Sequence, residues 1–262
     1  MSVSIHPTAV VDPAAKLGED VSIGPFCVVG PAVQLGDRVR LTSHVVVEGR
    51  THIGSDSVIY PFASIGHRPQ DLKFKGEPSE LIIGRNNQIR EHVTMSPGTE
   101  GGGMVTRIGD NGLFMVGVHV AHDCVVGNNA VLANNATLAG HVELGDFVTI
   151  GGLSAVRQFV RIGSHAMIGG MSGVEKDVIP YGLVMGDRAR LAGLNLVGLE
   201  RRGFQKDEIH ALRAAYRLLF GNEGTFAERM EEVGRDMGQQ TLVADVLTFA
   251  RASRSLCQPR EG

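Results

Sequence analysis

Large apolar residues recur at every sixth position over most of this chain. The series runs unbroken from Ile5 to Ile65, returns at Ile83, and resumes in a new phase from Ile108 to Val174. A helix repeats its faces about every 3.6 residues and a strand about every two, so a period of six fits neither. A six-residue repeat is typical of a parallel β-helix, and it predicts a mainly β fold.

The period also predicts which residues meet in space. Each unit makes one short strand and one corner, with the large apolar residue and a small residue four places later pointing inward. Glycine often follows the apolar residue, as at Gly18 and Gly24, and we expect it to permit the turn at the corner. Three units close a coil of eighteen residues, so residues n and n+18 should stack about 4.8 Å apart.

Two segments interrupt the repeat. Residues 67–80 and 98–104 place polar residues or glycine where the core position should be, so we expect both to leave the prism as loops. Residues 1–187 are predicted to form the β-helix domain with these two extruded loops. Residues 188–262 are predicted to form a connector and a small helical domain.

Helical periodicity supports this division of the chain. Ile209, Leu212 and Tyr216 are spaced three or four residues apart. Further on, Thr225 and Glu228 match a capping box at the start of another helix. We therefore expect several short helices after the end of the repeat.

Composition narrows the class of protein. The net charge of −3 argues against a general nucleic-acid binder. The three cysteines, Cys27, Cys124 and Cys257, show no paired framework, which fits a reducing compartment. Neither a signal peptide nor an apolar run of about 18 residues is visible, so we expect a soluble cytoplasmic protein.

Histidines gather at one place in the repeat. His122, Gly140 and Gln158 are eighteen residues apart and should form a column, with Asp123 and His141 in the neighbouring column. In acyl transfer, His122 would act as a general base and Asp123 would orient its ring. The Gly140 N–H would stabilise the oxyanion, and the missing side chain would leave room for a substrate.

Two other interpretations remain open on the residues alone. His119, His122 and His141 are candidate zinc ligands, as in carbonic anhydrases of β-helical fold, although the two histidines five apart that ligate the metal there are missing. The histidines are otherwise surface residues at the corners of a purely structural solenoid.

Several segments together resemble one family. They are the His119-Val-Ala-His-Asp-Cys-Val-Val-Gly127 stretch, the segment from Leu132 to Val142, the Ile23-Gly-Pro-Phe-Cys27 opening, the Gln70-Asp-Leu-Lys73 loop, and the stretch from Asn195 to Phe204. With them the chain closely resembles the UDP-N-acetylglucosamine O-acyltransferases. The resemblance implies a left-handed coil, a homotrimer, and no metal or other cofactor. It also implies transfer of a 3-hydroxyacyl group from acyl carrier protein to the glucosamine 3-position of UDP-N-acetylglucosamine, the first step of lipid A biosynthesis.

The resemblance implies a role for each matching residue. His122, Asp123 and Gly140 are the catalytic residues. The substrate-binding residues are Asp71, Lys73, His119, His141, Gln158, Asn195, Arg201 and Arg202. A glycine at Gly170 leaves the acyl groove open, so a long donor of about fourteen carbons is expected, each buried methylene adding roughly 0.8 kcal/mol. We expect this groove to run up the coils above Gly140, over Gly152 and Gly170.

Some features of the family stay open. The acceptor can be the sugar nucleotide itself or its 3-amino analogue, because some members use the amino sugar. The related N-acyltransferases carry an extra domain before the repeat, whereas here the repeat starts at Ile5. Arg157, Arg188 and Val197 differ from the common family pattern, in positions that bear on donor and nucleotide contacts.

Overall fold

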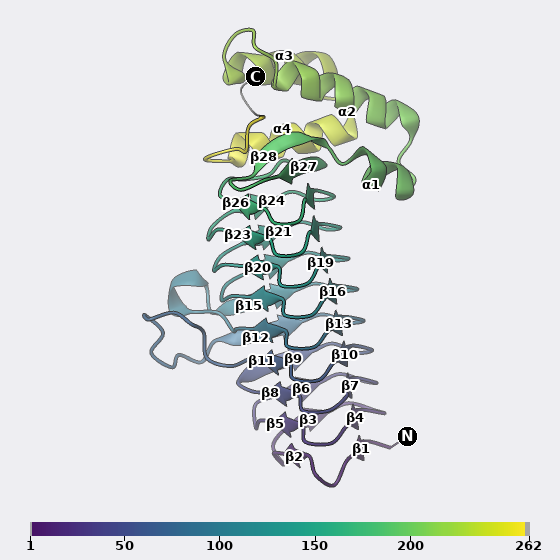
Figure 1. Ribbon diagram of the computed structural model, residues 1–262, viewed down its shortest axis with the longest axis vertical. Helices are drawn as coiled ribbons and strands as arrows, with labels where there is room; N and C mark the ends of the chain where they lie inside the picture. Colours follow the sequence, from purple (N-terminus) through teal and green to yellow (C-terminus); the bar gives the residue numbers. More distant parts are fainter. Residues whose placement is uncertain (1, 260–262) are drawn as a thin grey trace.

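The computed structural model describes residues 2–259, which form a tall three-sided prism with helices across one end (Figure 1). Each side of the prism is a parallel sheet of short strands. Sheet 1 consists, in order, of β1 (Ser4–Ile5), β4 (Ser22–Ile23), β7 (Arg40–Leu41), β10 (Val58–Ile59), β13 (Gln88–Ile89), β16 (Leu113–Phe114), β19 (Val131–Leu132), β22 (Thr149–Ile150), β25 (Met167–Ile168), β27 (Gly182–Met185) and β28 (Arg190–Leu194).

The other two sides are built in the same way. Sheet 2 consists of β2 (Val10–Val11), β5 (Val28–Val29), β8 (Val46–Val47), β11 (Ser64–Ile65), β14 (Thr94–Met95), β17 (His119–Val120), β20 (Thr137–Leu138), β23 (Ala155–Val156) and β26 (Gly173–Val174). Sheet 3 consists of β3 (Lys16–Leu17), β6 (Gln34–Leu35), β9 (Arg50–Ile53), β12 (Glu80–Ile83), β15 (Val105–Ile108), β18 (Val125–Val126), β21 (Glu143–Leu144) and β24 (Arg161–Ile162).

The eighteen-residue stacking predicted from the repeat is confirmed. Thr149, for example, pairs with Val131 below it and with Met167 above it. The large apolar residues and the small residues four places later fill a continuous core. At the open first end the core is incomplete, and Ile5 is 45% exposed because no coil lies beneath it. We call the three edges of the prism the 1–2, 2–3 and 3–1 edges, after the sheets that meet there.

The corner glycines serve a different purpose from the one expected. Gly18 and Gly24 do not adopt a positive φ; the left-handed residues lie two places later, at Asp20 and Phe26. A Cβ at Gly24 would instead overlap with the carbonyl oxygen of Thr42, in the next coil. Glycine is therefore needed there for close approach between coils and not for the backbone angle.

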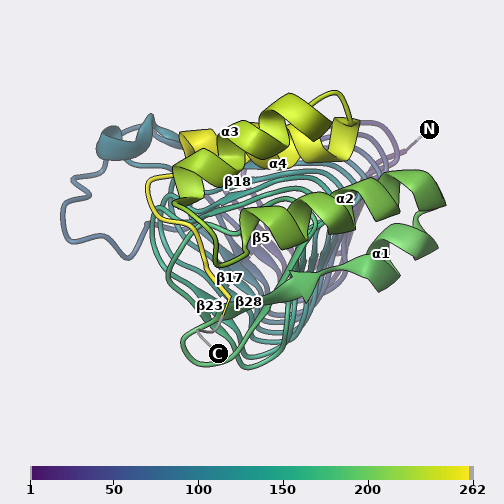
Figure 2. The same cartoon turned by 90° about the horizontal axis from the view of Figure 1, so that it is seen from above.

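Both loops leave the prism at the 2–3 edge. One connects β11 to β12 and the other, with a short 3₁₀ turn at Glu100–Gly102, connects β14 to β15. Figures 1 and 2 show the two loops projecting from a single edge of the prism. The loops join at their bases, because Glu80 N–H donates to the Met104 carbonyl and Gly98 N–H donates to the Glu80 carbonyl.

Helices close the far end of the prism. After β28, which pairs antiparallel with β27, come α1 (Leu196–Arg201), α2 (Lys206–Leu219), α3 (Phe226–Met237) and α4 (Thr241–Ala252). The capping box predicted at Thr225 and Glu228 is confirmed at the start of α3. Seen from above, the helices lie across the end of the prism (Figure 2), burying residues such as Leu212 and Val246. None of the helices within residues 2–259 is long and apolar enough to cross a bilayer.

Because the coils stack closely, a single methyl group added between them should have a large effect on stability. We expect Gly24→Ala to lower the free energy of unfolding by about 2 kcal/mol, because the new Cβ forces two coils apart. Gly101→Ala is the matched control, since a Cβ there has no heavy atom within 4 Å and its φ is not positive. Thermal unfolding of the two variants checks this, and equal midpoints would contradict it.

Candidate active site

Three of the residues predicted to form the site, His122, Asp123 and His141, lie together at the 2–3 edge. His122 and Asp123 occupy the turn between β17 and β18, and His141 occupies the equivalent turn one coil further on. The imidazole of His141 stacks on Phe159 with ring centroids 4.4 Å apart. It meets the His122 ring edge-on at 5.2 Å. Two imidazoles and a carboxylate therefore lie close together on this edge.

His122 and Asp123 form a hydrogen-bonded pair. Nδ1 of His122 lies 2.7 Å from Oδ2 of Asp123. A carboxylate accepts, so Nδ1 carries the hydrogen and Nε2 keeps its lone pair. Asp123 has a φ of 61°, and this left-handed backbone turns its side chain back toward the ring of its neighbour. The pair therefore presents a basic nitrogen to a substrate at the edge.

The second loop holds the carboxylate of Asp123. Thr99 donates its backbone N–H to Oδ1 at 2.7 Å and its hydroxyl to Oδ2 at 2.6 Å. Thr106 accepts the backbone N–H of Asp123 at 2.7 Å. A Cβ at Gly102 would overlap with the carboxylate. Sequence reasoning missed these residues, and the only signal for them was the glycine-rich interruption of the repeat.

Gly140 lies one coil above His122 and contacts its imidazole. A Cβ at Gly140 would sit 2.6 Å from Cε1 and 2.7 Å from Nε2 of that ring. The expectation that the missing side chain leaves room for a substrate is wrong, because the ring of His122 takes that room. Among residues 2–259 the N–H of Gly140 has no hydrogen-bond partner, whereas those of Ala139 and His141 are bonded. This N–H is free to bind an oxyanion.

Two further histidines lie beside the pair. Burial lowers the pKa of His119, the positive charge of a protonated His122 lowers it further, and its Nδ1 lies 2.7 Å from the Thr94 hydroxyl. Burial also lowers the pKa of His141, against an opposing effect of the Asp123 charge. Both rings are therefore neutral near pH 7, and each can donate or accept a hydrogen bond.

The first loop brings Asp71 and Lys73 toward His141. The charges of both residues act on the pKa of His141, which places them within electrostatic reach of the ring. Asp71 Oδ1 accepts the backbone N–H of Lys73 at 3.0 Å. The buried Phe74 anchors this loop, with the guanidinium of Arg68 over its ring and donating to its carbonyl.

Other predicted residues lie at different places. Gln158 is exposed on the 2–3 edge, beside Phe159. Asn195 caps α1 through the Gly198 N–H and donates to the carbonyl of His165, on the 3–1 edge. Arg202 donates to the carbonyl of Phe147 on the same edge, and Arg201 is exposed in α1. Since one side of a coil spans roughly 20 Å, the side chains of Asn195, Arg201 and Arg202 are not brought to His122 within one chain.

Gly170 lies at the third edge. Gly152 and Gly170 stack at the 1–2 edge, in turns that connect sheet 1 to sheet 2, whereas Gly140 is at the 2–3 edge. The expected column that continues from Gly140 over Gly152 and Gly170 is therefore wrong. Gly140 therefore lies at one margin of sheet 2, and Gly152 and Gly170 lie at the other.

The metal interpretation loses its support in this geometry. The residues whose ligand atoms come together, within 4.8 Å, are His122, Asp123 and His141, and His119 is not among them. Nδ1 of His122 and Oδ2 of Asp123 are 2.7 Å apart. Two ligands of a tetrahedral zinc ion are roughly 3.3 Å apart. The arrangement is that of a hydrogen-bonded pair.

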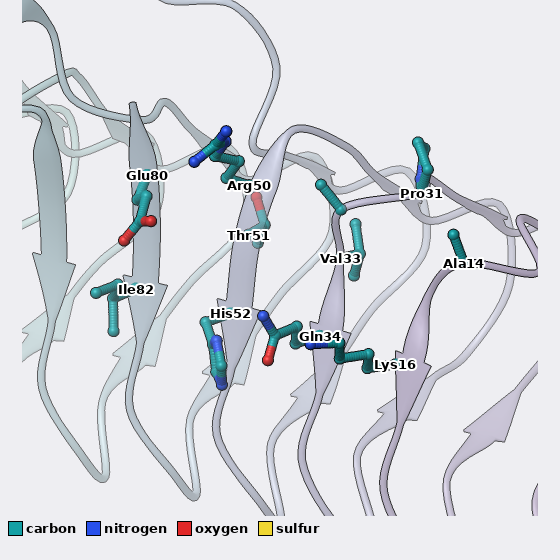
Figure 3. A pocket seen from close by; sticks show the side chains of 11 residues that line it. Ala14, Lys16, Pro31, Val33, Gln34, Arg50, Thr51, His52, Glu80 and Ile82 are labelled. Carbon is teal, nitrogen blue, oxygen red and sulfur yellow. The ribbon is translucent and has the colours of Figure 1, made fainter. Parts of the chain in front are cut away.

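A separate cavity of about 320 Å³ lies on sheet 3 (Figure 3). Lys16, Gln34, Arg50 and His52 line it, together with Glu80. It contains none of the predicted site residues and faces solvent from another side of the prism. We assign it no part in the chemistry at the 2–3 edge.

Comparison with known proteins places this geometry in a family. A family described as bacterial transferase hexapeptide (six repeats) matches residues 14–49 and 106–140. A second, described as UDP N-acetylglucosamine O-acyltransferase, domain 2, matches residues 177–257. The hexapeptide match and the structural neighbours confirm the left-handed parallel β-helix with a small C-terminal helical part.

Relatives are similar over nearly their whole length. The acyl-[acyl-carrier-protein]--UDP-N-acetylglucosamine O-acyltransferase of Caulobacter vibrioides is 57% identical over 259 residues, 98% of this chain and 98% of the relative. That of Rickettsia canadensis is 54% identical over 97% of each chain. A crystal structure of UDP-N-acetylglucosamine acyltransferase superposes with a TM-score of 0.95 at 44% identity, covering 98% of this chain and 100% of that one. This chain therefore belongs to the UDP-N-acetylglucosamine O-acyltransferase family.

Proposed function

We propose that this protein transfers a 3-hydroxyacyl group from acyl carrier protein to the 3-hydroxyl of UDP-N-acetylglucosamine, the first step of lipid A biosynthesis. Relatives 54% and 57% identical to it carry the name of this activity. The observation that carries the proposal is the His122–Asp123 pair, with its free Nε2 next to the unpaired N–H of Gly140. This arrangement suits acyl transfer from a thioester to a hydroxyl group.

The reaction follows from these two groups. Nε2 of His122 takes the hydrogen of the sugar hydroxyl as its oxygen bonds to the thioester carbonyl carbon. The carbonyl oxygen becomes negatively charged and accepts a hydrogen bond from the Gly140 N–H. Collapse of this intermediate breaks the carbon–sulfur bond, and the leaving thiolate takes the proton from His122. Asp123 stabilises the imidazolium that exists between these steps.

The donor is delivered by an acidic carrier protein. A cavity of about 900 Å³ between the last coils and the helices is lined by Lys176, Arg188 and Arg190, with Arg229 behind them. Within residues 2–259, Asp187 is the only acidic residue that lines it. Charge complementarity speeds the encounter of such partners. We assign the carrier protein to this surface.

A homotrimer explains why the predicted residues lie on separate edges. The outer positions of sheet 1 from β10 to β27 and those of sheet 2 are uncharged or histidine, whereas sheet 3 presents Lys16, Arg107, Glu143 and Arg161. The 1–2 edge also exposes large apolar side chains, at Phe26, Phe62, Leu153 and Met171. Surfaces of this kind are normally covered by another chain. In the proposed trimer the 2–3 edge of one copy meets the 3–1 edge of the next, which joins His122 to the partner's nucleotide contacts.

The first prediction tests the function and its base together. With UDP-N-acetylglucosamine and a 3-hydroxyacyl carrier protein, we expect His122→Ala to lower kcat about a hundred- to ten-thousandfold, the usual contribution of a general base. His52→Ala, exposed on sheet 3, is the control and should keep wild-type turnover. Faster turnover of the 3-amino sugar nucleotide would change the acceptor, and no transfer to either sugar would refute the function.

The second prediction concerns the shared site. His122→Ala and Arg202→Ala homotrimers should each have little activity, because each lacks one side of every site. Random mixing of the two variants should restore about a quarter of the sites, namely those with an intact 2–3 edge facing an intact 3–1 edge. Activity that never exceeds the sum of the two homotrimers would place the whole site within one chain.

The third prediction concerns the length of the acyl chain. A Cβ at Gly170 meets only the Gly152 carbonyl at 3.4 Å and its nitrogen at 3.9 Å, so a longer side chain can extend outward without displacing the coil. Gly170→Met should move the preference from about fourteen carbons to shorter donors, because each methylene excluded from the groove loses roughly 0.8 kcal/mol. Competition between donors of different length measures this. Equal use of short and long donors by the wild type would exclude Gly170 as a determinant of length.

A further inference from the structure

Thr99 binds both oxygens of one buried carboxylate. Its backbone N–H donates to Oδ1 of Asp123 and its hydroxyl donates to Oδ2, the oxygen that also receives Nδ1–H of His122. Thr99 is 4% exposed and the side chain of Asp123 is 0% exposed. Water is therefore excluded from both oxygens. The residue that donates to both oxygens of Asp123 comes from a loop and lies 24 positions earlier in the chain.

The environment makes these two bonds strong. A buried carboxylate needs donors on its oxygens, and bonds to a charged acceptor are worth more than neutral ones. His141 cannot replace Thr99, because its Nε2 is 3.8 Å from Oδ2. Without the hydroxyl, Oδ2 would keep, among residues 2–259, only the bond from His122, and the loop would hold the carboxylate through the Thr99 N–H on Oδ1 alone.

Thr99 is itself fixed by the loops around it. Its carbonyl accepts the N–H groups of Gly102 and Met104, at 3.1 and 2.9 Å. The next residue, Glu100, donates its N–H at 3.2 Å to Oε1 of Glu77, in the loop that carries Asp71 and Lys73. These hydrogen bonds hold the loop in place, and with it the hydroxyl of Thr99.

We propose that Thr99 is a positioning residue for the acyl transfer, which acts through Asp123. Its hydroxyl holds Oδ2 in the orientation that receives Nδ1–H of His122, and so aims Nε2 at the acceptor hydroxyl. This inference rests on the proposed function and adds the second loop to the catalytic machinery. The loop would otherwise be only an insertion that the fold tolerates.

Three variants separate positioning from folding. We expect Thr99→Val to lower kcat about ten- to hundredfold with little change in KM for the sugar nucleotide, as for loss of a hydrogen bond to a charged group. Thr99→Ser keeps the hydroxyl and should restore kcat to within a few-fold of wild type. Thr51→Val is the matched control, because Thr51 is also buried and its hydroxyl donates to the Glu48 carbonyl, away from Asp123. It should keep wild-type kcat.

A double-mutant cycle tests whether Thr99 acts through Asp123. In an Asp123→Asn background, adding Thr99→Val should cost little further activity, because the carboxylate it serves is gone. An equal loss in both backgrounds would overturn the inference, as would a Thr99→Val kcat equal to that of wild type. Failure of Thr99→Ser to restore kcat, with thermal unfolding unchanged, would overturn it too.

A spectroscopic measurement is independent of the substrates. The Nδ1 proton of His122, identified by its loss in His122→Ala, should give a downfield proton resonance in protein labelled with ¹⁵N-histidine. In Thr99→Val it should shift or broaden, and in Thr51→Val it should not move. An inactive wild type with this pattern would refute the proposed function and keep the positioning role, whereas an active wild type without it would refute the positioning role alone.

Discussion

The stacking of each residue under the one eighteen positions later is the constraint on which this structure depends. Because coils lie at strand spacing, every residue is a neighbour of its counterparts in the coils above and below. That is why a methyl group at Gly24 would reach the carbonyl of Thr42, although its own backbone angle is ordinary. The same contact operates at the catalytic edge. The ring of His122 lies under Gly140, so the coil that follows His122 must have a glycine at that place.

A second constraint is the burial of the Asp123 carboxylate. The regular repeat supplies it with the ring of His122 only, and a buried charge with one donor is costly. The interruption of the repeat after Met95 solves this, since the chain returns past the turn with the Thr99 N–H and hydroxyl aimed at both oxygens. The departure from regularity is thus a structural requirement of the pair. The proposed chemistry therefore depends on the second loop, which the regular repeat does not predict.

The sequence predicts the regular features of this molecule and misses the irregular ones for a physical reason. Periodicity reports contacts between residues n and n+18, so the core and the column of Gly140 over His122 could be foreseen. Thr99 touches Asp123 across 24 residues, through a loop whose length belongs to no period. The place of Gly170 was also mistaken, although the same rule excludes it: Gly152 is twelve positions after Gly140, which is two sides of a coil and not a whole one. Positive φ angles occur at residues such as Phe26, two places after the corner glycine that was expected to permit the turn.

The separation of residues over three edges also explains what can vary within such a fold. The His122–Asp123 pair and its support from Thr99 lie on one edge of one chain, so under the proposed function a change at His122 removes the base and the loss of the Thr99 hydroxyl weakens its orientation. Asn195 and Arg202 lie on another edge, and Gly170 on a third. Under the proposed function, substitutions there would alter the fit of the nucleotide or the acyl chain without touching the pair. Arg188, before β28, and Val197, in α1, are close to this second group along the chain. Specificity can therefore change at the proposed interface between copies while the proton transfer at the 2–3 edge stays the same.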